Sequence, residues 1–237
     1  MKGMNKMDFI LSINNLSKKY YNKTALENIN LNFEKGKIYG LMGPNGSGKT
    51  TLMKVIAGLH KQTSGDVLIN NVPASYKTKE NISFMPTDDF LYDSFKVKQI
   101  LKYYSDMYID FNYENAFKIL GDIGVDTEFK VSKLSSGLKG KLKVTLALSR
   151  DADIYMLDEP LNGVDVLARD TIIDLIVKSY NENKTFIISS HLVSEIEKTF
   201  DSVIFLKDGL IELSGDAEDL RQKHEMSIEN LYKEVYK

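Results

Sequence analysis

The chain has 237 residues, 43% of them apolar, enough for one large domain or two small lobes with a buried core. Its 31 basic residues balance 33 acidic ones, which excludes the strong overall positive charge typical of nucleic-acid-binding proteins, although local patches remain possible. The absence of cysteine fits a reducing cytosol, no apolar run approaches the roughly 20 residues that cross a bilayer, and residues 1–8 lack the apolar block of a signal peptide.

The first part of the chain is predicted to consist mainly of strands, because apolar and polar residues alternate or short apolar runs occur. The predicted strands span 9–16, 25–33, 38–42, 67–70 and 81–85, and a helix is predicted over 51–57. The polar segment 18–23 reads as a turn and carries two aromatics, Tyr20 and Tyr21, upstream of the third strand.

From residue 90 to 148 the apolar residues take helical spacing and many are aromatic, which predicts an inserted helical lobe at about 88–148. Its aromatics form either the core of that lobe or a hydrophobic groove for a partner helix. Continuous apolar strands follow, with helices between them, and this alternation predicts a parallel sheet covered on both faces. These strands span 154–157, 186–189 and 203–206, the helices span 166–180 and 192–200, and residues 217–237 are expected to form a charged surface helix.

The segment 43–51 reads GPNGSGKTT and matches the phosphate-binding pattern G-x-x-x-x-G-K-[ST] between a predicted strand and a predicted helix. Glycines let the backbone turn its N–H groups inward, and the helix adds its positive end, so the loop binds an anion. We expect the anion to be a triphosphate, with Lys49 at the β and γ phosphates and the Thr50 hydroxyl on Mg²⁺. The expected nucleotide-binding residues here are Gly43, Pro44, Asn45, Gly46, Ser47, Gly48, Lys49, Thr50 and Thr51.

An acidic pair, Asp158 and Glu159, comes directly after the apolar strand 154–157. In a nucleotide-hydrolysing site, an aspartate at the end of a buried strand holds Mg²⁺ through water. The neighbouring glutamate orients and polarises the attacking water. The sequence therefore predicts MgATP chemistry, with Asp158 and Thr50 at the metal and Glu159 as the base.

With these residues in place, the chain resembles the ATP-binding subunits of ABC transporters over nearly its whole length. The landmarks follow in the family's order: the phosphate loop, the signature segment Leu134–Leu138, Asp158–Glu159–Pro160, the segment 162–165, and Ser189–Ser190–His191. The resemblance implies an α/β fold: a P-loop NTPase core with a mostly parallel sheet, an antiparallel β subdomain and an inserted helical subdomain. It places the ATPase domain at 7–215 and a C-terminal helical tail at 216–237.

The resemblance also implies a head-to-tail dimer, formed with a second copy or a related ATPase subunit, that encloses two ATP molecules. Ser135, Ser136 and Gly137 would then face the γ-phosphate bound by the opposite subunit from a helix N-terminus. His191 would hydrogen-bond the γ-phosphate and act with Lys49 and Glu159 in catalysis. Tyr20 matches the adenine-stacking aromatic by its distance from Ala25 and Leu26, with Tyr21 as the alternative, and Asp165 would lie across the dimer contact.

Two positions depart from the family pattern. Leu138 stands where the signature usually ends in glutamine, and we expect little loss from this change. Thr87 stands where a glutamine normally reaches Mg²⁺ and the water and links the catalytic and helical lobes. Threonine is too short for that reach, so we hypothesise that water or Asp88 bridges the gap.

The resemblance favours an ATPase subunit that drives a separate transmembrane permease, with an exporter preferred, on the inner face of the cell membrane. The alternative is a soluble ABC-type ATPase of DNA maintenance or translation. The segment between Lys49 and Leu134 is too short for the coiled coils of DNA-maintenance ATPases. Translation ATPases usually have two cassettes, and this chain has one.

A GTPase is disfavoured because the string NKMD at 5–8 precedes the phosphate loop and no D-x-x-G occurs. A regulatory module that binds ATP without hydrolysis is favoured by Thr87 but contradicted by Glu159 and His191.

Overall fold

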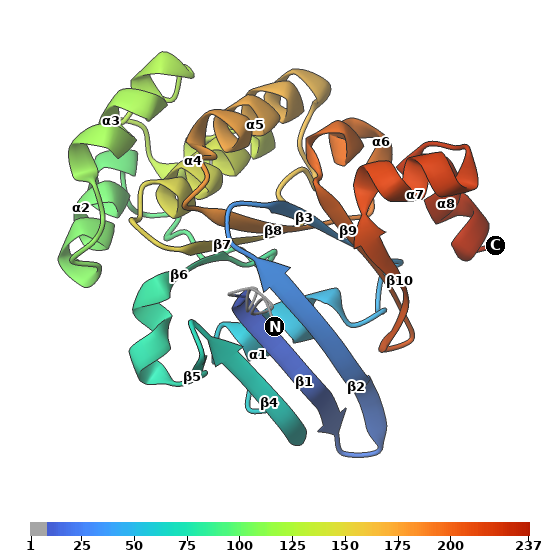
Figure 1. The fold of residues 1–237 in the computed structure, drawn as a ribbon. Coiled ribbons are helices and arrows are strands. Elements are labelled where there is room, and N and C mark those ends of the chain that lie inside the picture. Colours follow the sequence, from blue (N-terminus) through green and yellow to red (C-terminus); the bar gives the residue numbers. More distant parts are fainter. Residues whose placement is uncertain (1–8) are drawn as a thin grey trace, which may run out of the picture.

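The computed structural model describes residues 9–237, so the predicted domain start at residue 7 and the string 5–8 lie outside the described residues. Its central sheet has the strand order β10-β9-β3-β8-β7-β6 (Figure 1). The pairs that join β9, β3, β8, β7 and β6 are parallel, and β10 pairs antiparallel with β9. The bounds are β3 Ile38–Met42, β6 Ile82–Met85, β7 Ile154–Asp158, β8 Thr185–Ser190, β9 Ser202–Lys207 and β10 Leu210–Asp216.

A second, antiparallel sheet has the order β2-β1-β4-β5. Its strands are β1 Phe9–Tyr20, β2 Lys23–Glu34, β4 Ser64–Ile69 and β5 Val72–Pro73. The predicted turn at 18–23 is shorter than expected, because β1 continues to Tyr20 and β2 already begins at Lys23. Tyr21 has a φ of 47°, the left-handed conformation that tight hairpins require.

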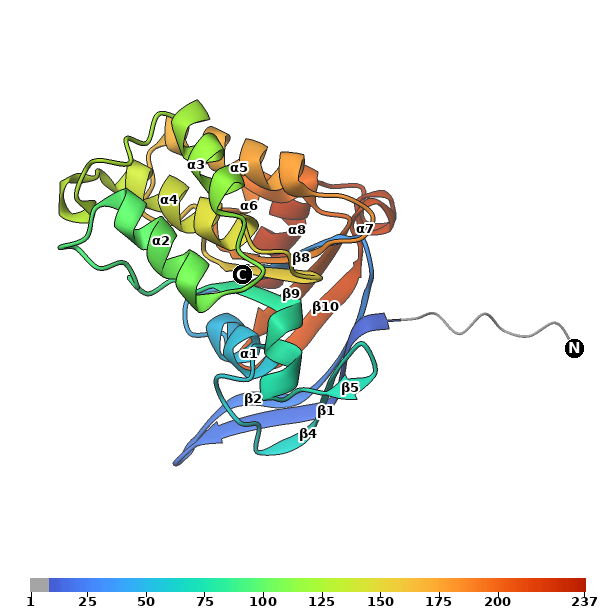
Figure 2. The same ribbon diagram turned by 90° about the vertical axis from the view of Figure 1, so that its left-hand side faces the viewer.

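Helix α1, Lys49–Ile56, lies between the two sheets and shares one core with both (Figures 1 and 2). Strand β3 supplies Tyr39 and Leu41 to this core and Ile38 and Met42 to the core on its other face. Side chains of a strand alternate between faces, so a fully buried strand needs apolar residues throughout. This burial fixes β3 and therefore the loop that follows it.

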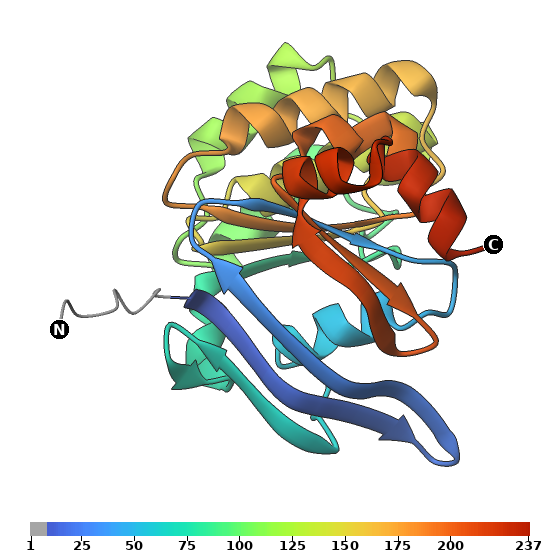
Figure 3. The same ribbon diagram turned by 45° about the vertical axis from the view of Figure 1, so that its right-hand side comes forward.

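Helices cover the other face of the central sheet, and their buried residues form a second hydrophobic core with it. These are α4 Ser136–Leu148, α5 Val166–Ser179, α6 Val193–Ile196, α7 Ala217–His224 and α8 Ile228–Val235. The predicted helix at 192–200 is a short α6 followed by a 3₁₀ turn, Glu197–Thr199. The predicted single surface helix at 217–237 is wrong, because the segment forms two helices, α7 and α8 (Figure 3). These helices bury Leu220, Ile228 and Leu231. The division at 215/216 stays a prediction.

The inserted segment forms a lobe of α2, Val97–Met107, and α3, Tyr113–Asp122, packed against α4 (Figure 2). Its core contains Leu142 and Leu146 from α4, whereas Val144 and Leu148 of the same helix face the central sheet. Helix α4 therefore joins the lobe to the central sheet. Short 3₁₀ helices at Tyr76–Asn81 and Val131–Lys133 complete the elements. Over residues 9–237, none of the helices has the length and apolar character needed to span a bilayer.

Candidate functional site

The predicted phosphate loop connects β3 to α1 and needs its glycines for space and conformation. Gly46 and Gly48 have φ values of 82° and 112°, which side chains rarely adopt. A Cβ on Gly43 would lie 2.3 Å from the Leu206 carbonyl oxygen, and one on Gly48 would lie 2.8 Å from that of Ala25. The loop is therefore held tightly between β9 and β2, with its backbone leading into the N-terminus of α1.

Lys49 is buried at the start of α1 and reaches back over the loop. Its Nζ donates to the carbonyl oxygens of Gly43 at 2.7 Å and Pro44 at 3.3 Å. The same ammonium lies 3.3 Å from Glu159 Oε1, an ion pair without hydrogen-bond geometry. Within residues 9–237, the buried Ser47 hydroxyl and Glu159 Oε1 have no hydrogen-bond partner. The ammonium of Lys49 and the free Ser47 donor fit a triphosphate, whereas Glu159 Oε1 only accepts and fits a water molecule.

Asp158 ends the buried strand β7, and polar groups bind both of its carboxylate oxygens. Thr50 Oγ1 donates to Asp158 Oδ2 at 2.7 Å, and Ser189 Oγ donates to Asp158 Oδ1 at 2.5 Å. No group of three or more acidic, histidine or cysteine side chains that could hold a metal occurs within residues 9–237. Mg²⁺ needs none, because it binds through one or two carboxylates together with substrate phosphates and water. The Thr50 and Asp158 oxygens fit that ion.

Glu159 is held at the carboxyl edge of the sheet in the left-handed conformation, with a φ of 52°. Its backbone N–H donates to the Ser189 hydroxyl at 2.8 Å. Its Oε2 accepts from the backbone N–H of His191 at 3.3 Å and lies 2.7 Å from His191 Nδ1. Because a carboxylate oxygen only accepts, His191 carries its proton on Nδ1. Glu159 and His191 thus form one hydrogen-bonded unit beside Lys49.

A pocket of about 500 Å³ collects these groups, within the size range of small-molecule sites. It is lined by Tyr20, Lys23, Ala25, Asn45, Gly46, Gly48, Lys49, Thr50, Thr51, Thr87, Asp88, Glu159, Asn162 and His191. The structure therefore brings the phosphate loop, the predicted base Glu159 and His191 to one cavity. Lys23, for which no role was predicted, also lines it, as does Asn162 of the landmark segment 162–165. Ser189, predicted only as part of the landmark that ends in His191, binds both Asp158 and Glu159 behind the cavity. Lys23 begins a strand and Ser189 lies near the end of one, so their positions were the only signal in the sequence.

Tyr20, the expected adenine-stacking residue, lies at the rim of this pocket, whereas Tyr21 is fully exposed. The Tyr20 hydroxyl bonds His60 Nδ1, and the Lys18 ammonium lies 4.6 Å from the centre of its ring. Burial, with Lys54 and Lys18 nearby, lowers the pKa of His60, so the neutral ring accepts this bond at pH 7. The ring of Tyr20 is thereby oriented at the pocket's edge.

The signature residues form a second surface beside this pocket. Ser135 caps α4 by accepting from the Leu138 N–H at 3.2 Å, and Ser136 is exposed beside it. A Cβ on Gly137 would lie 2.6 Å from Asp165 Oδ2, and Asp165 caps α5 through the Ala168 N–H at 3.0 Å. Among the described residues that line the phosphate-loop pocket, none belongs to this group. Ser136 does line a neighbouring cavity of about 220 Å³ that also contains Thr87, Asp158 and Glu159. Ser135, Gly137 and Asp165 line neither of the two cavities.

Thr87 donates its hydroxyl to the Asp158 carbonyl oxygen at 3.2 Å. Asp88 also lines the pocket, but its carboxylate is 79% exposed and pairs with Lys54 at 3.3 Å. The hypothesis that Asp88 bridges to the metal site therefore gains no support from these contacts. Instead, Thr87 itself holds the strand end that carries Asp158.

Comparison with known proteins identifies this arrangement. The ABC transporter family model matches residues 26–162, more than half of the chain. The chain belongs to the ABC transporter family. The resemblance drawn from the motifs is confirmed, and this ATP-binding subunit is an ATPase of that family.

Two curated bacterial relatives cover most of the subunit. The lantibiotic transport ATP-binding protein SrtF of Streptococcus pyogenes is 32% identical over 209 residues, which are 87% of this chain and 91% of SrtF. The ABC transporter ATP-binding protein YtrB of Bacillus subtilis is 31% identical over 218 residues, 91% of this chain and 75% of YtrB. These relatives favour a transporter subunit over a soluble ATPase with another role.

Solved structures show the same fold. An ATP-binding subunit of an ABC transporter aligns with a TM-score of 0.84 at 23% identity, covering 96% of this chain and all of that one. The dimeric cassette MJ0796 aligns with a TM-score of 0.78 at 24% identity, covering 87% of this chain and 98% of the other. The predicted P-loop NTPase fold, with its antiparallel β subdomain and inserted helices, is confirmed.

Proposed function

We propose that two copies of this subunit, or one copy and a related subunit, enclose two MgATP molecules and drive a separate membrane permease by hydrolysing them. The observation that carries the proposal is the split site. Lys49, Thr50 and Glu159 line one pocket, whereas the capped N-terminus of α4 and Asp165 are exposed and absent from its lining. A helix N-terminus binds anions, so the second surface completes the pocket of another copy.

The residues of the pocket divide the chemistry among them. Lys49 and the loop N–H groups bind the phosphates, and Thr50 and Asp158 hold Mg²⁺, which when bound neutralises phosphate charge. Glu159 orients a water and accepts its proton, and the hydrogen bond from His191 Nδ1 fixes the Glu159 carboxylate. In the closed pair, Ser135 and Ser136 of the other copy would face the γ-phosphate, and Tyr20 would stack on adenine.

The test is ATP hydrolysis measured against protein concentration, with and without Mg²⁺, for the purified chain and for Glu159→Gln. We expect a rate that rises faster than linearly with concentration and vanishes without Mg²⁺. The variant should lose turnover and accumulate an ATP-bound dimer, because it binds nucleotide but lacks the base. A rate strictly proportional to concentration argues against the shared site, and a rate insensitive to Glu159 argues against the assigned base.

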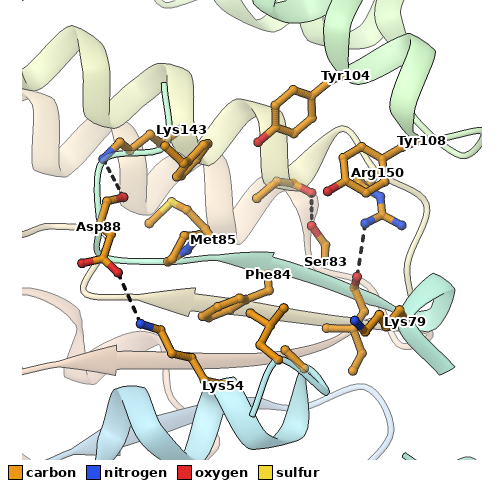
Figure 4. Close-up of a pocket in the computed structure, with 16 residues that line it drawn as sticks. Lys54, Lys79, Ser83, Phe84, Met85, Asp88, Tyr104, Tyr108, Lys143 and Arg150 are labelled. Atoms are coloured by element: carbon orange, nitrogen blue, oxygen red, sulfur yellow. Dashed lines mark hydrogen bonds and ion pairs between the residues drawn. The ribbon is translucent and has the colours of Figure 1, made fainter. Parts of the chain in front are cut away.

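The permease contact is proposed at a groove of about 460 Å³ between the helical lobe and α1 (Figure 4). Phe84 and Met85 of β6 line one side of it, and Tyr104 of α2 and Tyr108, just after that helix, line the other side. Asp88 lines both this groove and the phosphate-loop pocket. An apolar groove suits a short partner helix, and the shared segment around Asp88 gives a route by which nucleotide state reaches it.

The exposed groove residue Lys79 tests the permease contact. Lys79→Glu should leave the ATPase rate of the isolated subunit unchanged, because Lys79 does not line the phosphate-loop pocket. The same change should reduce the rate of the subunit assembled with its permease. Lys178→Glu is the matched control, because Lys178 is an exposed residue of α5, and it should change neither rate. Equal behaviour of the two variants in the assembled transporter would argue against this groove.

The transporter is proposed to be an exporter whose ATPase subunit is held at the inner face of the membrane by the permease. SrtF is named for lantibiotic transport, which supports a system that moves a compound made in the cell. Inside-out vesicles containing the complete transporter provide the test, because external ATP then drives an exported substrate inward. ATP-dependent loss of preloaded substrate from such vesicles would indicate import.

A further inference from the structure

The C-terminal end of the chain contacts the base of the phosphate loop. The Tyr236 hydroxyl lies 3.0 Å from the Leu206 carbonyl oxygen and 3.2 Å from that of Met42, and donates its proton between them. Met42 is the last residue of β3, directly before Gly43. The Leu206 oxygen is the atom that a Cβ on Gly43 would meet first. The hydroxyl therefore joins the two backbone groups that fix where the loop begins.

Burial and neighbouring contacts hold Tyr236 in this position. Its ring contacts those of Tyr232 and Phe205, with ring centres 4.5 and 6.0 Å away. Lys207 Nζ donates to the Val235 carbonyl oxygen at 3.3 Å and so fixes the end of α8 to β9. Burial raises the pKa of Tyr236, so its hydroxyl keeps its proton throughout the physiological range.

Two sets of contacts connect this anchor to the catalytic groups. The Gly43 carbonyl oxygen accepts from Lys49 Nζ at 2.7 Å, so the position of Gly43 sets that of the lysine. Helix α8 also contacts α6, which begins at Val193 just after His191. The Glu229 N–H of α8 donates to Glu197 Oε2 at 2.8 Å. The C-terminal helix thus contacts both the start of the phosphate loop and the segment that follows His191.

We propose that Tyr236 is a positioning residue for nucleotide binding: through α8, the C-terminal end of the chain holds the phosphate loop in its binding conformation. This inference rests on the proposed function. If the empty loop must first become ordered, the free energy of ordering is subtracted from that of nucleotide binding. The apparent affinity for nucleotide is then lower. The hydroxyl of Tyr236 reduces that cost, so its loss should act mainly on affinity for nucleotide.

Tyr236→Phe removes the hydroxyl and keeps the partly buried ring. Tyr180→Phe is the matched control, since the Tyr180 hydroxyl also donates to a backbone carbonyl, that of Gly36 at 2.7 Å, just before β3. One change therefore removes a bond at the loop end of β3 and the other a bond at its opposite end. For each variant we would measure ADP affinity by calorimetry, the KM and kcat for ATP, thermal unfolding, and hydrogen exchange of amides 43–50 without nucleotide.

We expect Tyr236→Phe to weaken ADP affinity and raise KM by about fivefold, the factor expected from one lost hydrogen bond, with kcat little changed. Amides 43–50 should exchange faster in Tyr236→Phe and at the normal rate in Tyr180→Phe. Wild-type affinity and exchange in Tyr236→Phe, or equal changes in both variants, would overturn the inference while leaving the proposed function intact. A wild-type chain that binds no ADP would overturn both.

Discussion

The buried serine at the end of β8 sets the geometry of the acidic pair. Ser189 Oγ donates to Asp158 Oδ1 and accepts from the Glu159 N–H, so one side chain positions both the proposed metal ligand and the proposed base. Both bonds lie in the interior, where an unsatisfied polar group destabilises the fold by about 1–3 kcal/mol. Ser190, the next residue, is equally buried but accepts from the Leu192 N–H instead.

Ser189→Ala should therefore reduce ATP turnover far more than Ser190→Ala. Ser189→Ala leaves Asp158 Oδ1 and the Glu159 N–H without their shared partner, whereas Ser190→Ala releases only one backbone N–H of the next turn. Steady-state ATPase rates, compared at matched thermal stability, give the measurement. Similar losses in the two variants would mean that the serines act only through stability.

Thr87 is one of the two positions predicted to depart from the family pattern, and its hydroxyl supports the backbone of Asp158. Thr87→Val keeps the shape and removes the bond, so we expect turnover to fall about three- to tenfold, in line with one hydrogen bond. Thr87→Ser should retain most of the rate. Thr87→Gln, the usual family residue, measures whether the longer side chain adds to turnover. A Thr87→Val enzyme as fast as the wild type would show that this bond has no catalytic role.

At the scale of elements, the sequence predicts best where a local pattern determines the backbone. The phosphate loop has one pattern and one conformation, so Gly43–Thr51 and the flanking β3 and α1 lie where expected. The prediction of a surface helix at 217–237 failed because the segment is rich in charged residues. Helix α7 is mostly polar and buries only Ala217 and Leu220. Strand β10 escaped prediction because it is an edge strand whose residues are only partly buried. The contacts of Ser189 and Tyr236 join residues distant in sequence, so no local pattern could reveal them.

Leu231 tests the finding that α8 is part of the core. It is 2% exposed and packs in the core that covers the central sheet. Leu231→Ala should lower the free energy of unfolding by about 2–5 kcal/mol, the usual result of truncating a buried leucine. Leu210→Ala, at a leucine that is 43% exposed, is the control and should have a much smaller effect. Equal urea-unfolding midpoints for Leu231→Ala and the wild type would mean that α8 does not pack as described.

At the scale of the whole molecule, the two separate surfaces predict how two defective copies should complement each other. Lys49→Ala removes the ammonium from the phosphate pocket. Ser136→Glu puts a negative charge at the exposed N-terminus of α4. There it interacts favourably with the helix dipole but repels a phosphate. Each variant alone should be inactive, since every site in its dimer carries the same defect.

Mixing the two variants should restore hydrolysis. In a mixed dimer, the pocket of the Ser136→Glu copy meets the intact signature of the Lys49→Ala copy, while the other site carries both defects. For an equal mixture, in which half of the dimers are mixed and each has one good site, we expect about a quarter of the wild-type rate. Mixing Ser136→Glu with the double variant Lys49→Ala, Ser136→Glu is the control and should stay inactive, because no pocket then meets an intact signature. A first mixture without activity would mean that a single chain completes its own site. An active Ser136→Glu variant would mean that the N-terminus of α4 takes no part in hydrolysis.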